Sequence, residues 1–439
     1  MVMRFDIIRR YLMYRRLNVA FVQNVTDIDD KIIAKVVSLG VDPIAMTREY
    51  TTEFYELAGK LHVLPVDNLT KVTEFIPQII SFIEQLIERG FAYATAEGNV
   101  YFDVAKKDDY GKLTNQNVSM LYESVRKEVE RDKRAPLDFA LWKSDSSTAL
   151  SSPSPWGVGR PGWHIECSAM IYETLGPRID IHGGAMDLKF PHHENEIAQS
   201  EAHSNGEFAN IWMHCGLLNI DGQKMSKSLN NFVRLSEGVE RYGVAPLRFA
   251  VARHHYRSSL DLSYQLVKES LNSLLDFHRL FTRVPTEGYE PQAADREDPF
   301  LAKLVEDFEV AMDNDFNTPE AMVVLEQSRN AIVRELDAQP SETIPDVLKA
   351  RVAVVRQLGF ILGVFFDSLE QVQKEGLTVV ANSLGVTPLS VAEIAAALKE
   401  RLEARAAKNF ARSDEMRAYL SARGVEVLDS KDGTTWRFA

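Results

Sequence analysis

Three residues in the middle of the chain have the side chains and the spacing of a metal site. Cys167 lies in GRPGWHIECSAM (159–170), and His192 and Glu196 lie in DIHGGAMDLKFPHHENEIAQSE (180–201). His192 and Glu196 are four residues apart, so on a helix they share one face. Thiolate, imidazole and carboxylate are all zinc ligands, and three protein ligands leave one position of a tetrahedral ion open. The spacing therefore predicts a zinc site of the catalytic kind.

The same residues also have an ordinary interpretation. A single cysteine is usually a small buried hydrophobe, and a His–Glu pair at this spacing is usually part of a solvated helix face. Spacing alone, beside a Gly-Gly turn and a second histidine at 193, leaves the two interpretations balanced. The only other cysteine, Cys215, lies on an expected strand and is interpreted as a buried small residue. Two cysteines are too few for a disulfide framework, and we expect a reducing, cytoplasmic environment.

A second chemical motif is KMSKS at 224–228. Lys224 and Lys227 are three residues apart, and on a loop they can reach a triphosphate as point charges. Such charges offset the negative charge that builds up on the phosphates as an adenylate forms. A short Lys/Ser motif also occurs in ordinary surface loops. Its position after the strand-like segment WMHCGLLNI (212–220) favours the ATP-binding interpretation.

These motifs need a scaffold, and the hydrophobic pattern predicts one of the α/β class. Residues 163–262 alternate short apolar strands with helices. The N-terminus is apolar and rich in arginine like a transit peptide, but Asp6 and the helical spacing of Phe5, Ile8, Leu12 and Met13 favour an amphipathic helix. A strand is expected at 19–25 and another at 98–104. The two α/β segments, 5–33 and 163–262, flank an insertion at about 60–130.

The C-terminal half has a different pattern. Long helical periods begin near residue 265 and predict an all-helical bundle. A polar linker is expected at 366–390, and the last part of the chain is expected to form helices followed by a small β element. Trp436 in this element could stack on a base or close the small β unit.

Basic residues recur in the tail at partly helical spacing: Arg401, Arg405, Lys408, Arg412, Arg417 and Arg423. A basic helical face could contact phosphates. It could equally pair with Glu400, Glu403 and Glu415 on a solvated helix. The chain as a whole is acidic, with 50 Lys and Arg against 63 Asp and Glu. This balance argues against a general DNA-binding protein but does not exclude RNA. No apolar run is long enough for a membrane span, so no membrane partner is expected.

Through KMSKS the chain resembles class I aminoacyl-tRNA synthetases, and in further segments it resembles the cysteinyl-tRNA synthetase family in particular. These segments are NVTDIDDKI (24–32), DFALWK (138–143), SPWGVGRPGWHIECSAM (154–170), DIHGG and DLKFPHHENEIAQSE (within 180–201), KMSKSLNNF (224–232), HYRSSLDLS (255–263), DNDFNTPEA (313–321) and GTTWR (433–437). The resemblance runs from residue 4 to the last residues of the chain.

The resemblance implies a domain order. A Rossmann-type catalytic domain is expected at 1–235, with the connective insertion inside it. A stem-contact region at 236–300 follows, then a helical bundle of the DALR kind at 301–370. A small α+β domain that binds the anticodon is expected at 385–439.

The resemblance also implies an activity. The family joins L-cysteine to ATP, giving cysteinyl-adenylate, and passes the cysteinyl group to tRNA(Cys). One Zn²⁺ per chain binds the substrate thiolate. The positions that match family site residues are Cys167, His192 and Glu196 for the zinc, Trp163 and His182 for the amino-acid pocket, Thr26 for the substrate amino group, and Lys224 and Lys227 for ATP and catalysis. A monomer is expected.

The sequence departs from the family pattern in two important places. The family has a further cysteine as a fourth zinc ligand and a His-x-Gly-His motif that holds ATP, and neither occurs in these 439 residues. The segment FDIIRRYL (5–12) resembles the helix that follows that motif. We therefore expect a chain that starts just past the motif and lacks the first strand, with impaired activity as given. A start assigned at an internal methionine is favoured over a true fragment.

Two smaller departures and two alternative functions remain. Ala185 and Asn230 stand where the family usually has glycine, and Ala185 is strained if its φ is positive. A non-catalytic tRNA-binding relative is the main alternative to the ligase. A relative that joins cysteine to a small amine is disfavoured, because it needs no anticodon-binding end such as GTTWR indicates.

Overall fold

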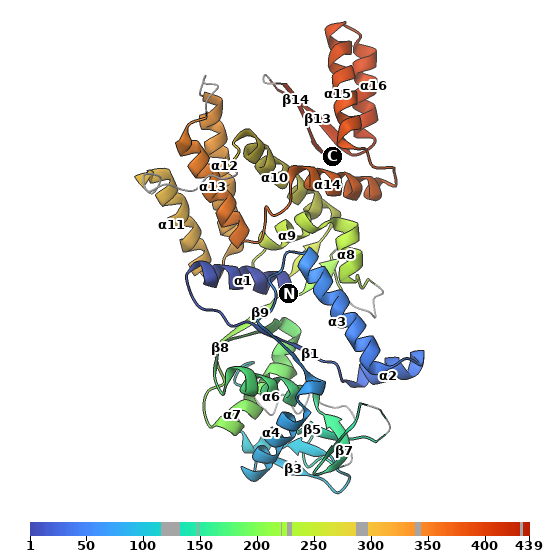
Figure 1. The fold of residues 1–439 in the computed structure, drawn as a ribbon, viewed down its shortest axis with the longest axis vertical. Helices are drawn as coiled ribbons and strands as arrows, with labels where there is room; N and C mark the ends of the chain where they lie inside the picture. Colours follow the sequence, from blue (N-terminus) through green and yellow to red (C-terminus); the bar gives the residue numbers. More distant parts are fainter. Residues whose placement is uncertain are drawn as a thin grey trace. The chain divides into compact units, whose positions relative to one another are not determined.

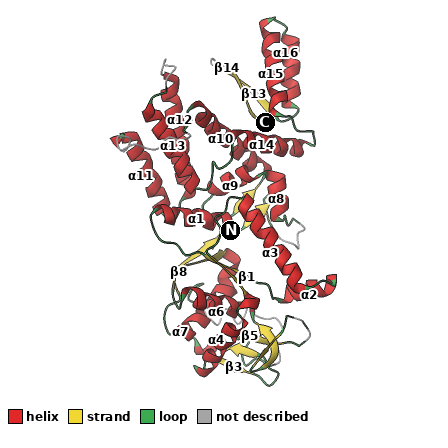
Figure 2. Cartoon of the chain, in the orientation of Figure 1, coloured by secondary structure: helices red, strands yellow, loops and turns green. Residues whose placement is uncertain are grey.

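The structure, a computed structural model, describes residues 1–115, 132–146, 148, 150–220, 222–225, 231–286, 297–338, 344–430 and 433–439 (Figures 1 and 2). The chain divides into two compact units. Unit 1 comprises Met1–Val19, Leu57–Leu64 and Gly216–Ala439, and unit 2 comprises Ala20–Glu56 and Pro65–Cys215. No helix among the described residues is both long enough and apolar enough to span a membrane.

Unit 2 contains two parallel strand pairs. β1 (Val22–Val25) pairs with β2 (Asn68–Lys71), and β8 (Ile179–Ala185) pairs with β9 (Ala209–Cys215). The predicted strand at 19–25 is confirmed, although it starts at Val22. Parallel strands need a crossover connection, and α7 (Glu194–Ser204) supplies it between β8 and β9. Among the described strands the two pairs are not hydrogen-bonded to each other, so a single continuous Rossmann-type sheet is not formed.

An antiparallel sheet forms the other half of unit 2. Its strands, in spatial order, are β3 (Ala92–Ala94), β4 (Val100–Phe102), β5 (Phe139–Ser144), β7 (Gly157–Pro161) and β6 (Ser152–Ser154). The strand predicted at 98–104 is confirmed as β4. Phe102, Leu141 and Trp142 are fully buried. They belong to one hydrophobic core with side chains of α4 (Ile76–Glu88) and α6 (Trp163–Leu175). This sheet spans residues 92–161 and includes the strand that leads into α6.

The remaining regular segments of unit 2 are shorter or more exposed. They are α2 (Asp30–Leu39), most of α3 (Pro43–Lys60), the 3₁₀ turns Val72–Glu74, Val104–Lys106 and Met186–Leu188, and a π-helical turn at Lys189–His193.

Unit 1 is mainly helical, with a small three-stranded sheet and a terminal hairpin among its described residues (Figure 2). β10 (Leu218–Ile220) lies between β11 (Gln223–Lys224), which is antiparallel to it, and β12 (Leu260–Leu262), which is parallel. Its helices are α1 (Val2–Tyr14), α8 (Leu235–Tyr242), α9 (Val244–Ala252), α10 (Tyr264–Arg283), α11 (Pro299–Asp313), α12 (Thr318–Ala338), α13 (Asp346–Ile361), α14 (Leu369–Leu384), α15 (Val391–Ala406) and α16 (Phe410–Ser421). The chain ends in the hairpin of β13 (Val425–Ser430) and β14 (Gly433–Phe438).

The helix boundaries follow local chemistry. α11 begins with Pro299, and the Asp298 side chain accepts a hydrogen bond from the Phe300 amide. α15 begins with a capping box between Ser390 and Glu393. α14 ends at Gly385, whose φ of +66° is a conformation that glycine adopts without steric cost.

The N-terminal helix is confirmed, but its buried face differs from the predicted one. Ile7, Ile8 and Tyr11 are buried, whereas Met13 is 48% exposed. Asp6 is buried as well. The apolar spacing indicated the helix correctly, but ion pairs from distant parts of the chain decide which residues face inward.

The prediction of a polar linker at 366–390 is wrong. The segment contains α14, which begins at the cap residue Ser368 and packs against α10. Val372, Leu377 and Val380 of α14 are buried, and glutamine, glutamate and lysine fill the exposed positions between them. These apolar positions form one face of the helix, and packing of this face against the bundle stabilises the helix.

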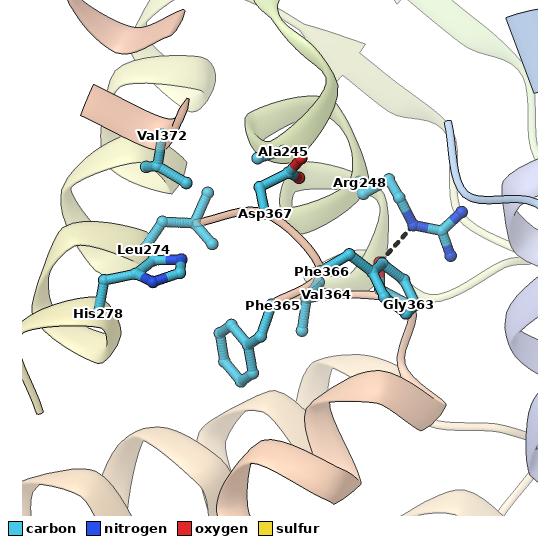
Figure 3. A pocket seen from close by; sticks show the side chains of 10 residues that line it. All are labelled: Ala245, Arg248, Leu274, His278, Gly363, Val364, Phe365, Phe366, Asp367 and Val372. Carbon is cyan, nitrogen blue, oxygen red and sulfur yellow. Dashed lines mark hydrogen bonds between the residues drawn. The ribbon is translucent and has the colours of Figure 1, made fainter. Parts of the chain in front are cut away.

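A buried ion pair joins four segments of unit 1. Arg248 of α9 is 2% exposed, and its Nη2 donates to Asp6 Oδ2 of α1 at 2.6 Å. Its Nη1 donates to the Leu61 carbonyl at 2.6 Å, and its Nε donates to the Gly363 carbonyl (Figure 3). Gly363 has a φ of +72°, and a Cβ there would lie 1.6 Å from Arg248 Nη2. Only glycine therefore allows the guanidinium to reach this position.

Candidate active site and metal centre

The predicted zinc ligands lie on two helices of unit 2. Cys167 is in the second turn of α6, whose N-terminus follows Gly162. A Cβ at Gly162 would lie 1.9 Å from the Ala140 carbonyl oxygen, so glycine lets α6 start directly against β5. His192 lies in the π-helical turn that leads into α7, and Glu196 lies in the first turn of α7. The predicted shared face is present, because His192 Nε2 is 2.8 Å from Glu196 Oε1.

The three side chains form a compact group. The ligand atoms of Cys167, His192 and Glu196 all lie within 4.8 Å of one another. Cys167 Sγ is 3.6 Å from His192 Nε2. A tetrahedral zinc with bonds of about 2.3 Å to sulfur and about 2.0 Å to nitrogen would separate these two atoms by about 3.5 Å. The sulfur–nitrogen distance is therefore compatible with a shared zinc ion.

Glu196 supplies the clearest sign that this group fits a metal ion. Its side chain is 0% exposed, and Oε1 makes no hydrogen bond despite its proximity to His192. Burial alone raises the pKa of Glu196, but the imidazoles of His182 and His192 together hold this pKa well below its usual range. A buried, ionised oxygen without a hydrogen bond is costly unless it has a ligand. The thiol, imidazole and carboxylate therefore fit zinc.

His182 contacts the second oxygen of the same carboxylate. Its Nε2 lies 2.6 Å from Glu196 Oε2, and its ring stacks on Trp212 with centroids 4.6 Å apart. His182, His193 and Glu196 form a second group of possible metal ligands. His193 Nδ1 lies 2.8 Å from His214 Nε2. Glu196 is thus the centre of a histidine network, and His182, predicted to line the amino-acid pocket, touches a predicted zinc ligand directly.

Sequence reasoning missed several residues that support the group. Asn24 Nδ2 donates to Cys167 Sγ at 3.5 Å. His164 Nδ1 lies 2.9 Å from His192 Nδ1, and Gln199 Nε2 donates to the His164 carbonyl at 2.9 Å. Asn24 begins the segment NVTDIDDKI and His164 lies within GWHIEC, so both stand in segments that were singled out without being assigned a role.

The two remaining pocket residues lie beside the metal group. The Trp163 ring centroid is 4.4 Å from that of His192, and Trp163 is 45% exposed. Thr26 Oγ1 donates to Glu166 Oε2 at 3.5 Å. Glu166 precedes Cys167 on α6, and burial, with Asp29 and Asp27 nearby, raises its pKa well above the usual value. A partly exposed indole therefore lies beside His192, and a hydroxyl contacts the residue that precedes Cys167.

The lysines of KMSKS are described only in part. Lys224 lies in β11, and its backbone pairs with Asn219 of β10. Lys227 lies outside the described residues, as does Asn230.

Other predictions have clear outcomes. Cys215 is 1% exposed, which confirms that it is a buried strand residue. Ala185 has a φ of −82°, so it is not strained.

The alternatives left open for the C-terminal tail are also resolved in part. Trp436 is 9% exposed and packs edge-on against Phe438, which favours the structural interpretation of this residue. Arg401 and Arg405 both pair with Asp429. Arg412 pairs with Glu400 and Glu415, as the solvated-helix alternative expects.

Comparison with known proteins defines the class of the chain. Residues 1–272 match the family of class I (C) tRNA synthetase catalytic domains, 307–367 match the DALR domain, and 387–437 match the cysteinyl-tRNA ligase anticodon binding domain. The structure of Mycobacterium tuberculosis methionyl-tRNA synthetase with methionyl-adenylate aligns with a TM-score of 0.59 and 14% identity, over 88% of this chain and 90% of that one. Fold and sequence together define a class I aminoacyl-tRNA synthetase.

Closer relatives define the family. Cysteine–tRNA ligase of Methylococcus capsulatus is 42% identical over 433 residues, which are 99% of this chain and 90% of the relative. The enzyme of Francisella philomiragia is 40% identical over 438 residues, with the same coverage. The chain belongs to the cysteine–tRNA ligase family of aminoacyl-tRNA synthetases.

Proposed function

We propose that the chain activates L-cysteine with ATP and transfers the cysteinyl group to tRNA(Cys), with one zinc ion at Cys167, His192 and Glu196. The observation that carries this proposal is the buried Glu196 Oε1, which lies 2.8 Å from His192 Nε2 without a hydrogen bond of proper geometry, beside a thiol sulfur 3.6 Å from the same nitrogen. Family membership supplies the substrates, and the metal group supplies a way to recognise cysteine.

Zinc bound here would take the substrate thiolate into its open position. A thiolate is a much better zinc ligand than a neutral hydroxyl, so cysteine is selected over serine. A hydrophobic pocket alone discriminates weakly between side chains of such similar shape. The chain's own residues prepare this selection: His182 and His192 keep Glu196 ionised, and Asn24 donates to the Cys167 sulfur.

The bordering residues orient the amino acid. The exposed face of Trp163 offers an apolar wall beside His192. The Thr26 hydroxyl donates its proton to Glu166, which leaves its lone pairs for the substrate ammonium group. Lys224 and Lys227 bind the ATP phosphates and offset the charge that forms on them during adenylate formation.

The domain roles follow the same proposal. The catalytic domain occupies 1–235 with its connective insertion, and 236–300 contacts the tRNA stem. The helical bundle at 301–370 connects to the anticodon-binding domain at 385–439. We infer a monomer that acts in the cytoplasm.

The 439 residues contain no His-x-Gly-His sequence and no cysteine besides Cys167 and Cys215. We infer that a polypeptide of these residues alone forms the adenylate slowly. Cysteine-dependent ATP–pyrophosphate exchange measures this directly, and robust exchange by the purified 439-residue polypeptide contradicts the inference.

The zinc content of purified variants tests the metal site. Cys167→Ala is expected to lower zinc from about one ion per chain to a small fraction, because it removes the thiolate ligand. The matched control is Cys215→Ala, which removes the only other cysteine from a buried strand and should retain the ion. Equal zinc in Cys167→Ala and the unchanged chain overturns the assigned site.

A further inference from the structure

The junction between α11 and α12 has an unusual backbone. Asp315 and Phe316 have φ values of +56° and +53°, so two consecutive non-glycine residues are left-handed. Such residues persist only where surrounding contacts hold them. Asp315 lies in the segment DNDFNTPEA, which the sequence singled out and to which the proposed function assigns no role.

The contacts that hold Asp315 come from three consecutive residues. Tyr256 Oη donates to Asp315 Oδ1 at 2.8 Å. Arg257 Nε donates to Oδ2 at 2.5 Å, and its Nη2 donates to Oδ1 at 3.1 Å. His255 Nε2 lies 3.0 Å from the Asp315 carbonyl oxygen. The side chains of the loop 255–257 thus converge on one aspartate of the helical bundle, and Tyr256 among them is only 3% exposed.

The same loop is tied to the segment that enters β10. The Gly216 amide donates to the Tyr256 carbonyl at 2.8 Å. Arg4 Nη1 donates to the carbonyls of Gly216 and Tyr256 at 2.8 and 2.9 Å, and its Nη2 donates to the Ser258 carbonyl at 2.9 Å. A Cβ at Gly216 would lie 2.3 Å from the Ser258 carbonyl carbon. The two backbones are therefore in direct contact, and a buried guanidinium bridges them.

The loop also continues into β12, which supports the hairpin of β10 and β11. Asn219 of β10 lies opposite Asp261 of β12, and Asp261 Oδ1 accepts from the Gly222 amide at 2.8 Å. Gly222, with a φ of +79°, lies in the turn between β10 and β11. β11 carries Lys224. A continuous series of contacts thus leads from Asp315 to the hairpin that begins KMSKS.

We propose that Asp315 is a positioning residue for the ATP step: it fixes the loop 255–258, and through this loop it fixes the β10–β11 hairpin that carries Lys224. The ATP part of this statement rests on the proposed function. Asp315 lies within the DALR match at 307–367. A shift of the helical bundle, for example on binding tRNA, would therefore reach the hairpin through Asp315 and the loop 255–258.

Hydrogen–deuterium exchange of the full chain without ligands tests the positioning role. Asp315→Ala removes the acceptor for Tyr256 and Arg257, and we expect exchange of residues 216–225 and 255–262 to rise roughly threefold or more through local opening. Exchange in α10 should stay unchanged. Asp315→Asn keeps an oxygen acceptor and tolerates a left-handed φ, so its effect should be intermediate.

Asp313→Ala is the matched control. Asp313 lies two residues earlier with comparable exposure, but it pairs with Tyr11 of α1 and with Arg15, which follows α1. Its loss should leave 216–225 unchanged. Unchanged exchange of 216–225 in Asp315→Ala overturns the proposal. An equal rise in both alanine variants, or a rise throughout the chain, also overturns it, because either result indicates loss of general stability.

Adding MgATP separates this inference from the proposed function. ATP should protect residues 222–232 of the unchanged chain, and Asp315→Ala should need roughly tenfold more ATP for the same protection. If ATP does not protect the unchanged chain, the proposed role of the KMSKS lysines is contradicted. The comparison without ligand still decides the role of Asp315. Equal ATP dependence in both proteins overturns the link between Asp315 and ATP.

Discussion

Asp6 in unit 1 and Glu196 in unit 2 are both fully buried carboxylates, yet their surroundings differ in kind. Asp6 accepts from Arg248 and Arg10 on Oδ2 and from the Leu64 amide on Oδ1. Glu196 faces two imidazoles, and its Oε1 has no hydrogen bond. Complete hydrogen bonding by arginine and amide groups is typical of a structural joint. Incomplete hydrogen bonding by titratable imidazoles, beside a thiol, is typical of a ligand site.

The comparison separates two uses of buried charge. Guanidinium stays charged at any physiological pH and donates in a fixed planar geometry, so the Arg248 joint needs nothing from outside the protein. Imidazole and thiol can lose protons and bind a metal, so the Glu196 group is complete only with a ligand. Removing a partner should therefore lower stability in the first case and metal affinity in the second.

Arg248→Ala is expected to have the largest effect on folding. It removes one partner of the buried Asp6 carboxylate and the guanidinium donor of two carbonyls, which costs about 3–5 kcal/mol of the free energy of unfolding. Urea denaturation measures this value. Arg253→Ala, at a more exposed arginine of the turn that ends α9, is the control and should cost less than about 1 kcal/mol. A cost below about 1 kcal/mol for Arg248→Ala contradicts the structural role of this joint.

His182→Ala should act mainly on the metal. His182 holds Glu196 Oε2, and loss of such a supporting contact weakens metal affinity by about 10–100-fold. Competition with a zinc chelator measures the change. The control is His203→Ala, on the same helix as Glu196: His203 stacks on Phe82 and contacts no atom of the metal group. If both variants keep the zinc affinity of the unchanged chain, metal binding at Glu196 does not depend on His182.

A smaller, pH-dependent effect is expected in unit 1 at Tyr11. Burial, together with the hydrogen bond to Asp313, raises the pKa of Tyr11 to about 12. A raised pKa of an acidic group means that its contribution to stability is complete below the unfolded value near pH 10. This contribution is lost as the pH rises towards 12, and it amounts to about 1–2 kcal/mol. Between pH 9 and 12 the free energy of unfolding of the unchanged chain should fall by this amount more than that of Tyr11→Phe. The same pH dependence in both proteins contradicts the prediction.

Residue types and the resemblance point to the metal group, whereas spacing alone leaves its interpretation open. His192 and Glu196 are neighbours through one helical turn, and Cys167 was recognisable by residue type. The contact of Cys167 with Asn24 joins segments 143 residues apart, and the contact of Glu196 with His182 joins a helix to a strand. No local periodicity encodes such contacts. The resemblance places Trp163 in the amino-acid pocket, but it assigns no role to the neighbouring His164.

The fold shows the same division. Long helices such as α10 and α12 are strongly periodic and were expected. The sequence does not indicate α14, because its first turns are rich in glutamine, glutamate and lysine like a linker, and the bundle supplies the packing partner of its apolar face. The strands are short, and their pairing into separate small sheets depends on contacts that the hydrophobic pattern does not specify. Which face of α1 is buried depends on Arg248, which lies more than 200 residues away in the sequence.

The most direct test of the central claim uses the protein loaded with cobalt in place of zinc. Cobalt bound by Cys167 gives a thiolate-to-metal absorption band, and L-cysteine should strengthen this band as its own thiolate enters the open position. L-serine at the same concentration should leave the spectrum unchanged, because its hydroxyl stays protonated. A spectrum that responds equally to both amino acids, or to neither, contradicts the claim that this metal group recognises cysteine.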